Sequence, residues 1–293
     1  MNLFSPREVV SNYIDLGVKK TRFPILKMYL LGVVAGIFIA FGGVVSNTAI
    51  HALENQGLAR VLSGFLWPIG LSIVTVLEGE LFLGNTMMVT TVLTRRASLP
   101  AVLKNWFFVY LGNITGGLLI STLVVFSGQL NLSDGNLALY TIQLAQSKTA
   151  MPFGATVILG ILCNILVCAA VICSSSAKDI PGRILGASIP VVFFITSGFE
   201  NAVANMYLIP VGILALNRPA YASLAAQVGI FPTHLNWNIY LMRNLLPVTI
   251  GNLIGGIGFG TILWLCHVRL TLKEQEREPE PEPEPEAEPE LVC

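Results

Sequence analysis

The sequence predicts an all-α polytopic membrane protein whose six transmembrane helices form two inverted three-helix repeats. Of its 293 residues, 54% are hydrophobic and only 12% are charged, and the mean hydropathy is +0.71. This composition is typical of a membrane protein and excludes an ordinary soluble domain. Six apolar segments reach the ~20 residues that a spanning helix needs. They are residues 25–49, 61–94, 101–127, 153–175, 183–214 and 244–268.

Residues 1–24 precede the first apolar segment and predict a cytoplasmic amphipathic helix over 5–20. Ser5, Pro6 and Glu8 form a typical helix start, with a capping hydroxyl and a carboxylate three residues later. Such a helix fits either the membrane surface or the side of the bundle. No cleavable signal peptide is expected, because the apolar stretch begins late and lacks a small-residue cleavage site.

The second and fifth segments are too long for simple spans, and each carries a glutamate followed five positions later by an asparagine. These pairs are Glu80 with Asn85, and Glu200 with Asn205. A charge at the centre of a membrane helix costs about 2.5–3.5 kcal/mol. Matched polar interruptions in two halves indicate broken helices with re-entrant loops around a midplane site.

An internal duplication joins the two halves, at about 25–127 and 153–268. The third segment contains LGNITGG at 111–117, and the sixth contains IGNLIGG at 250–256. The first and fourth segments share a four-residue spacing of small or polar residues, at 32 and 36 and at 160 and 164. Three spans per half is an odd number, so the second repeat is expected to be inverted. Glycines at this spacing also favour close helix packing and an oligomer.

The charge pattern predicts the orientation in the membrane. Thirteen of the 17 basic residues flank the segments on one side, and the other side holds only Arg60, Lys148, Arg218 and Arg243. The positive-inside rule then places both termini in the cytoplasm. Nine of the 17 acidic residues lie in 274–293. This Glu/Pro run predicts that 271–293 is a disordered acidic tail after a channel domain of 25–270.

No enzyme motif is present in the sequence. His51, His234 and His267 are scattered, and the five cysteines lack paired metal-binding spacing. There is no phosphate-binding loop, nucleophile–base arrangement or cofactor motif. We therefore expect neither an enzyme nor an ATP-driven pump, with no cofactor, no metal and no nucleic-acid partner.

Four motifs make the chain resemble the formate–nitrite transporter family over roughly residues 5–270. They are EGELFLGN at 78–85, WFFVYLGNITGG at 106–117, a lysine at 148 before GILCNILVC at 160–168, and SGFENAVANMYLIPVG at 197–212. The resemblance implies an aquaporin-like fold and a homopentamer. Each protomer would have its own pore for a small monovalent anion between the two repeats.

The resemblance also assigns eight pore residues by motif position. Two of them depart from the family pattern, since Leu83 stands where threonine is usual and Asn201 where histidine is usual. An amide hydrogen-bonds but does not titrate, which weighs against proton relay by the central residue. The assigned residues are Leu71 and Leu81 at the inner constriction, Trp67 and Phe194 at aromatic gates, Leu83 and Asn201 at the centre, and Lys148 and Asn164 at the outer mouth.

Physical arguments agree with these roles. Half-helix N-termini aimed at the midplane attract an anion, and Lys148 raises its concentration at the mouth, unless it is merely a solvated loop lysine. Apolar rings oppose a full charge, so a weak acid passes more easily as the neutral species. We expect Glu80 and Glu200 to accept hydrogen bonds from backbone N–H groups of the loops, with Asn85 and Asn205 as structural partners.

The predicted function is formate transport across the cytoplasmic (inner) membrane, by a channel or by a proton-linked facilitator. Its partners would be formate, protons in the linked mechanism, and the lipid bilayer. Three alternatives stay open: transport of nitrite, hydrosulfide, acetate or lactate; a non-conducting membrane scaffold or sensor; and a pore for neutral solutes. Glu78 has no assigned role.

Overall fold

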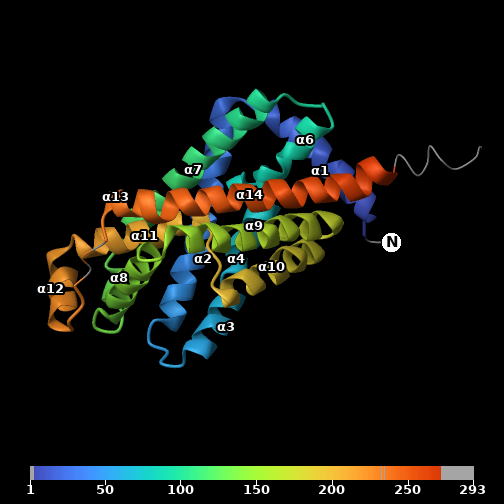
Figure 1. The fold of residues 1–293 in the computed structure, drawn as a ribbon. Coiled ribbons are helices and arrows are strands. Elements are labelled where there is room, and N and C mark those ends of the chain that lie inside the picture. Colours follow the sequence, from blue (N-terminus) through green and yellow to red (C-terminus); the bar gives the residue numbers. More distant parts are fainter. Residues whose placement is uncertain (1–2, 232, 234, 272–293) are drawn as a thin grey trace, which may run out of the picture.

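The computed structural model describes residues 3–231, 233 and 235–271, and these are helical apart from turns and one isolated β-bridge between Leu3 and Ala177. Six helical stretches are long and apolar enough to cross a membrane, which confirms the predicted class (Figure 1). They are α2 (Ile25–Ile50), α3 with α4 (Gln56–Leu66 and Pro68–Val76), α7 (Leu99–Phe126), α9 (Phe153–Ser176), α10 (Ile180–Ser197) and the run from α13 (Trp237–Ile239) through η3 (Tyr240–Leu245) and α14 (Leu246–Trp264) to η4 (Leu265–Leu270).

The N-terminal helix α1 (Pro6–Thr21) begins with the predicted capping box, in which Ser5 and Glu8 each accept a hydrogen bond from the other's backbone N–H. One face of α1 is buried against α9 and α6 (Val89–Leu93). The Tyr13 hydroxyl donates to the Gly84 carbonyl at 2.7 Å. Of the two expected placements, the structure therefore has α1 packed on the bundle.

Both of the overlong segments are interrupted where the glutamates lie. Helix α4 ends at Val76, and helical structure resumes with α5 (Phe82–Asn85), η1 (Thr86–Met88) and α6. Helix α10 ends at Ser197, followed by Gly198 in the left-handed region at φ 73°, and α11 (Ala202–Leu216) begins four residues later. Glu78 also has a positive φ of 53°. The interruptions leave residues 77–81 and 198–201 outside helices.

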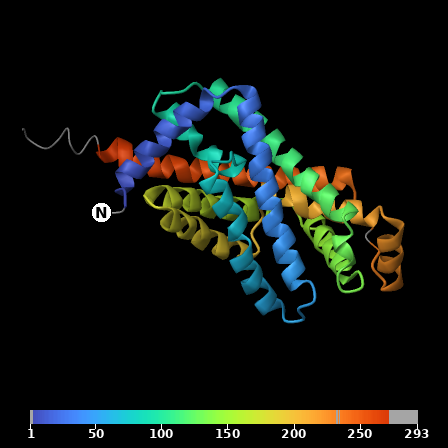
Figure 2. The ribbon, with the colours of Figure 1, turned by 180° about the vertical axis from the view of Figure 1, so that it is seen from behind.

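Close crossings of paired helices hold the bundle together. Helix α2 packs along α7, and α9 packs along α14. Glycines permit this approach, because a Cβ on Gly36 would overlap the Asn113 carbonyl and one on Gly255 would overlap the Ile161 carbonyl. Opposite views in Figures 1 and 2 show α9, α10 and α14 side by side.

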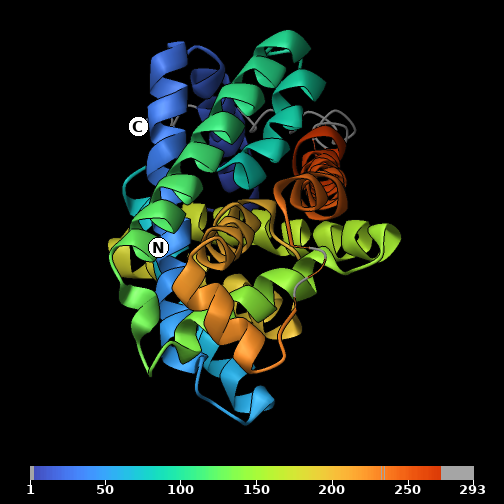
Figure 3. The ribbon, with the colours of Figure 1, turned by 90° about the vertical axis from the view of Figure 1, so that its left-hand side faces the viewer.

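Helix α11 lies at the centre of the molecule and is buried along nearly its whole length. Figure 3 shows it in orange-gold near the middle of the bundle. It contacts α7, α2 and α8 (Asn136–Thr149), and it turns through 87° into α12 (Pro219–Gln227). A short η2 (Gln129–Asn131) joins α7 to α8. The predicted acidic tail lies, from residue 272 onward, outside the described residues.

Candidate functional site: two hydrogen-bonded helix interruptions

Asn113 holds the first interruption in place. Its Nδ2 donates to the carbonyls of Gly32 at 2.8 Å and Glu80 at 3.0 Å, and its Oδ1 accepts from the Phe82 N–H at 3.0 Å. The Glu80 N–H donates to the Leu31 carbonyl at 3.1 Å. A helix break inside a membrane leaves backbone groups without partners, and one amide with two neighbouring helices satisfies them here.

Asn252 does the same at the second interruption. Its Nδ2 donates to Gly160 at 2.8 Å and Glu200 at 3.0 Å, and its Oδ1 accepts from the Ala202 N–H at 2.9 Å. The Glu200 N–H donates to the Leu159 carbonyl at 3.3 Å. The two sets of hydrogen bonds match one for one, which supports the internal duplication. The inverted orientation of the second half stays a prediction.

The first glutamate forms a buried ion pair with a lysine from α1. Lys20 Nζ lies 3.0 Å from Glu80 Oε1 and donates to Asn85 Oδ1 at 2.9 Å. Asn85 Nδ2 donates to Glu80 Oε2 at 2.6 Å and to Asn105 Oδ1 at 2.9 Å. The Glu80 side chain is 2% exposed and that of Lys20 is 15% exposed. The buried carboxylate is thus paired with a positive charge and hydrogen-bonded.

The second glutamate repeats this arrangement with a lysine from α8. Lys148 Nζ donates to Glu200 Oε1 at 2.7 Å. Asn205 Nδ2 donates to Glu200 Oε2 at 2.6 Å and to Asn244 Oδ1 at 2.8 Å, and Asn244 Nδ2 donates to the Lys148 carbonyl at 2.9 Å. Lys20 and Lys148 are each the second-last residue of their helix. The repeat therefore includes α1 and α8, beyond the boundaries predicted from the sequence.

The donors to the two carboxylates differ from those expected. Glu80 and Glu200 accept from lysine and asparagine side chains, whereas the loop N–H groups donate to Asn113 and Asn252. The expectation of backbone donors was therefore wrong, because a buried carboxylate gains more from a counter-charge than from neutral amides. Lys148 lies in α8, so it is not a solvated loop lysine.

Sequence reasoning missed several members of these two clusters. Their partners lie far away along the chain, so no local pattern connects them. The repeat could have revealed them, because two equivalent residues are separated along the chain by the same number of residues as the duplicated segments to which they belong. The residues missed are Lys20, Asn105 and Asn244. Asn113 and Asn252 were already matched by the duplicated motif, but their hydrogen bonds to the interruptions were not foreseen.

The apolar residues assigned to the pore all belong to the large hydrophobic core. All five side chains are at most 6% exposed, and none carries a charge. A water-poor apolar passage opposes a fully charged solute. The residues are Trp67, Leu71, Leu81, Leu83 and Phe194.

Asn201 is the N-cap of α11. Its Oδ1 accepts from the Ala204 N–H at 3.0 Å, and the side chain is 6% exposed. Within the described residues, no protein group accepts a hydrogen bond from its Nδ2. The equivalent position in the first repeat is Leu81, the N-cap of α5, which has no side-chain cap bond. The Asn201 oxygen thus stabilises the helix start, and its Nδ2 has no acceptor among the described residues.

Asn164 is fully buried in the packing between the two repeats. Its Nδ2 donates to the Asn252 carbonyl at 2.6 Å, to Thr86 Oγ1 at 3.0 Å and to the Leu83 carbonyl at 3.3 Å. This arrangement contradicts the expected position at an open outer mouth. Because α9 carries it against η1 and α14, Asn164 ties the first interruption to the second repeat.

A cavity of about 460 Å³ has Leu71 and Leu81, the two residues expected at the inner constriction, among its lining residues. Its charged lining residues are Lys19, Lys20, Lys27 and Arg183 with Glu78 and Glu80, so bases outnumber acids. Cationic walls around a narrow opening concentrate small anions in front of it. The part of the chain that the structure describes holds no cluster of three metal-ligating residues.

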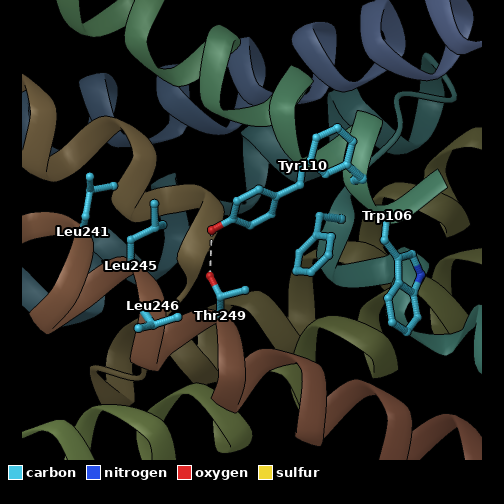
Figure 4. Close-up of a pocket in the computed structure, with 8 residues that line it drawn as sticks. Trp106, Tyr110, Leu241, Leu245, Leu246 and Thr249 are labelled. Atoms are coloured by element: carbon cyan, nitrogen blue, oxygen red, sulfur yellow. Dashed lines mark hydrogen bonds between the residues drawn. The ribbon is translucent and has the colours of Figure 1, made fainter. Parts of the chain in front are cut away.

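A second cavity, of about 410 Å³, opens on the side of the molecule between α7 and α14 (Figure 4). The Tyr110 hydroxyl and Thr249 Oγ1 are 2.7 Å apart across it. Its other walls are apolar, and Phe107, Leu241 and Leu246 are about half exposed. None of the expected pore residues lines it, so this apolar cleft is separate from the predicted pore.

The apolar spans and the two helix interruptions, which Asn113 and Asn252 hold by hydrogen bonds, are features of a polytopic membrane channel or transporter. The chain belongs to the formate/nitrite transporter family, because that family's model matches residues 7–266.

Named relatives and solved structures agree with this membership. The chain is 34% identical to the formate channel FocA of Escherichia coli (strain K12) over 275 residues, covering 92% of this chain and 96% of the relative. It is 32% identical to the formate channel BtFdhC of Bacillus thuringiensis, covering 91% and 97%. A pentameric formate channel with formate bound matches with a TM-score of 0.74 and 30% identity, covering 83% and 98%. An FNT family ion channel at 24% identity has the same fold, with a TM-score of 0.76 over 88% and 98%.

Proposed function

We propose that this chain conducts formate across a membrane through a pore in each protomer. The observation that carries the proposal is Asn201, whose Nδ2 has no acceptor among the described residues and lies at the start of a central helix. A carboxylate or carboxylic acid accepts such a hydrogen bond. Support comes from relatives that are formate channels and from a neighbouring structure that holds formate.

The residues divide the passage into steps. The cationic cavity gathers the anion in front of Leu71 and Leu81. The apolar cluster behind them disfavours the charge, so passage is easiest for a species that is neutral or hydrogen-bonded to Asn201. The lysines at positions 20 and 148 hold Glu80 and Glu200 as ion pairs, so neither carboxylate presents a bare negative charge to the permeant. Asn201 does not titrate, so proton linkage arises in the cavities rather than at the centre.

The assembly and location follow the same reasoning. We infer a homopentamer in the cytoplasmic membrane, since the matching solved channel is pentameric. The basic flanks of the segments favour both termini in the cytoplasm. No enzymatic activity is expected of this family member.

Formate uptake by reconstituted liposomes tests the proposal. Uptake of [14C]formate is measured at an outside pH of about 5 and about 7.5, for the wild type and for Asn201→His, because only the imidazole titrates in this range. Uptake at both pH values supports an anion pore, and uptake only at the acidic pH, shifted in Asn201→His, supports formic acid. An intact oligomer without formate flux in either protein contradicts the proposal. Nitrite, hydrosulfide, acetate, lactate and neutral solutes are then the next substrates to measure, before a non-conducting scaffold is considered.

A further inference from the structure

The cavity in front of Leu71 has a positive charge that the described residues do not balance. Lys19, Lys27 and Arg183 line it, and Glu78 is the acid on its wall that has no lysine or arginine partner in the described part of the chain. The remaining charged pair on the wall, Lys20 with Glu80, is neutralised internally.

Two further charged residues near this mouth, Lys178 and Asp15, have contacts of their own. Lys178 lies over the ring of Phe4, with Nζ 4.4 Å from the ring centroid, and Lys27 lies over the ring of Phe23 at 4.1 Å. Both rings belong to wall residues, and both lysines keep their positive charge in these contacts. Asp15 on α1 is paired with Arg96. Asp15 therefore does not neutralise Lys19, which lies on the same helix and lines the cavity.

The chain leaves the described structure close to this cavity. Helix η4, which ends at Leu270, packs against α1, and Figures 1 and 2 show its end beside α1 from opposite sides. The following 272–293 contain nine glutamates and two bases, Lys273 and Arg277. Twenty-two residues reach at most about 70 Å, several times the ~24 Å length of α1. The acidic segment is long enough to reach any point of the mouth.

We propose that the acidic Glu/Pro segment of residues 274–290 binds across this cationic mouth and competes there with the permeating anion. The glutamates offer multiple carboxylates to a group of exposed cations, and tethering supplies them at an effective concentration in the millimolar range. Prolines at alternate positions remove backbone donors and favour an extended segment, which spreads the carboxylates along the mouth. Salt weakens the contact, because the cations of the mouth, Lys19, Lys27 and Arg183, are exposed.

The carbodiimide cross-linking of carboxylates to lysines tests the contact itself, on the full chain in membranes. The expected result is tail glutamates joined to Lys19 and Lys27, and much less to Lys104, an exposed lysine that does not line the cavity. Cross-links that are absent from Lys19 and Lys27, or equally frequent at Lys104, overturn the proposal. This readout needs no transport, so it remains valid if the chain does not conduct formate.

The consequence for transport rests on the proposed function and is measured with a charge-neutral tail of the same length. All nine tail glutamates are changed to glutamine, and formate uptake is compared at low and high salt. We expect uptake about two- to fivefold faster than wild type at ~20 mM salt, and equal rates at ~0.5 M, where the Debye length falls to a few ångströms. Equal rates at both salt concentrations contradict competition by the tail. Lys104→Gln is the matched control and should behave as wild type.

Discussion

The two lysine–glutamate pairs each join a buried carboxylate to a lysine that is mostly buried. Each carboxylate is almost fully buried and depends on one lysine for its counter-charge. Removing one partner leaves an isolated charge in a poorly hydrated place, which is more harmful than removing both. Neutralisation thus explains how a glutamate is tolerated at the middle of a membrane protein.

Replacing Lys148 tests this argument. We expect Lys148→Met to destabilise the protein by about 3–5 kcal/mol, because Glu200 is left unpaired. The double variant Lys148→Met/Glu200→Gln should recover a large part of the loss, since the charge is gone. Thermal unfolding of the purified protein in detergent measures both. A double variant less stable than the single one contradicts the account.

Asn201 has two functions that different atoms perform. Its Oδ1 caps α11, and its Nδ2 is the donor we assign to the permeant. Asn201→Asp keeps the capping oxygen and removes the donor. A hydrogen bond to a charged group contributes about 1.5–3 kcal/mol, and the new carboxylate also repels the anion, so formate uptake should fall about tenfold or more at neutral pH. Because Asn201 is only 6% exposed, the unpaired charge should lower the melting temperature as well. Unchanged uptake in Asn201→Asp argues against contact with the permeant.

Helix α14 depends on glycine only where another helix crosses it. A Cβ on Gly251 would overlap the Val157 carbonyl of α9, whereas one on Gly258, on the same helix, meets nothing within 4 Å. The close approach, rather than the composition of the helix, therefore decides which glycine is required.

The two glycines make a matched pair of variants. Gly251→Ala should lower the stability by about 1–3 kcal/mol, because α9 and α14 must separate. Gly258→Ala should be neutral or slightly stabilising, since alanine is favoured over glycine in helices by about 1 kcal/mol. Melting temperatures of the intact oligomer give the comparison. Equal losses for both variants would falsify the role of the crossing.

The start of α1 predicts a pH dependence. Hydrogen bonds from the Ser5 backbone N–H and the Ser5 hydroxyl lower the pKa of Glu8 below its usual 4.5. A carboxylate with a lowered pKa stabilises the folded helix above its unfolded pKa, and this contribution is lost as pH falls through the folded value. Amide exchange over 6–21 should be slower in wild type than in Glu8→Gln near neutral pH, and the difference should vanish at about pH 3. A difference that persists there contradicts the cap.

Both halves of the molecule stabilise a broken membrane helix and its buried glutamate in the same way. Each half interrupts a membrane helix, closes the backbone gap with one asparagine and neutralises one glutamate with one lysine. The halves differ at a position assigned to the pore. Asn201 of the second half is equivalent to Leu81 of the first half. The lateral cleft at Tyr110 and Thr249, which are also repeat equivalents, lies where the halves meet.

The half-exposed apolar walls of that cleft belong to a large apolar surface, as a membrane oligomer requires. Native mass spectrometry from mild detergent should show five copies of the chain. The formate uptake should follow the pentamer peak after size separation. Monomers with full transport activity contradict the proposed assembly.

The sequence by itself determined the number of spans, the position of both interruptions, the capped helix α1 and the family, because hydrophobic length, local capping and motifs are short-range signals. Only the tertiary structure decided which groups satisfy the interruptions. Lys20 meets Glu80 and Asn113 meets Phe82 because helices distant in the chain cross there. Asn164 shows most clearly what the sequence could not determine. Its motif position predicted a place at the outer mouth of the pore, whereas the crossing of α9 with α14 buries its side chain.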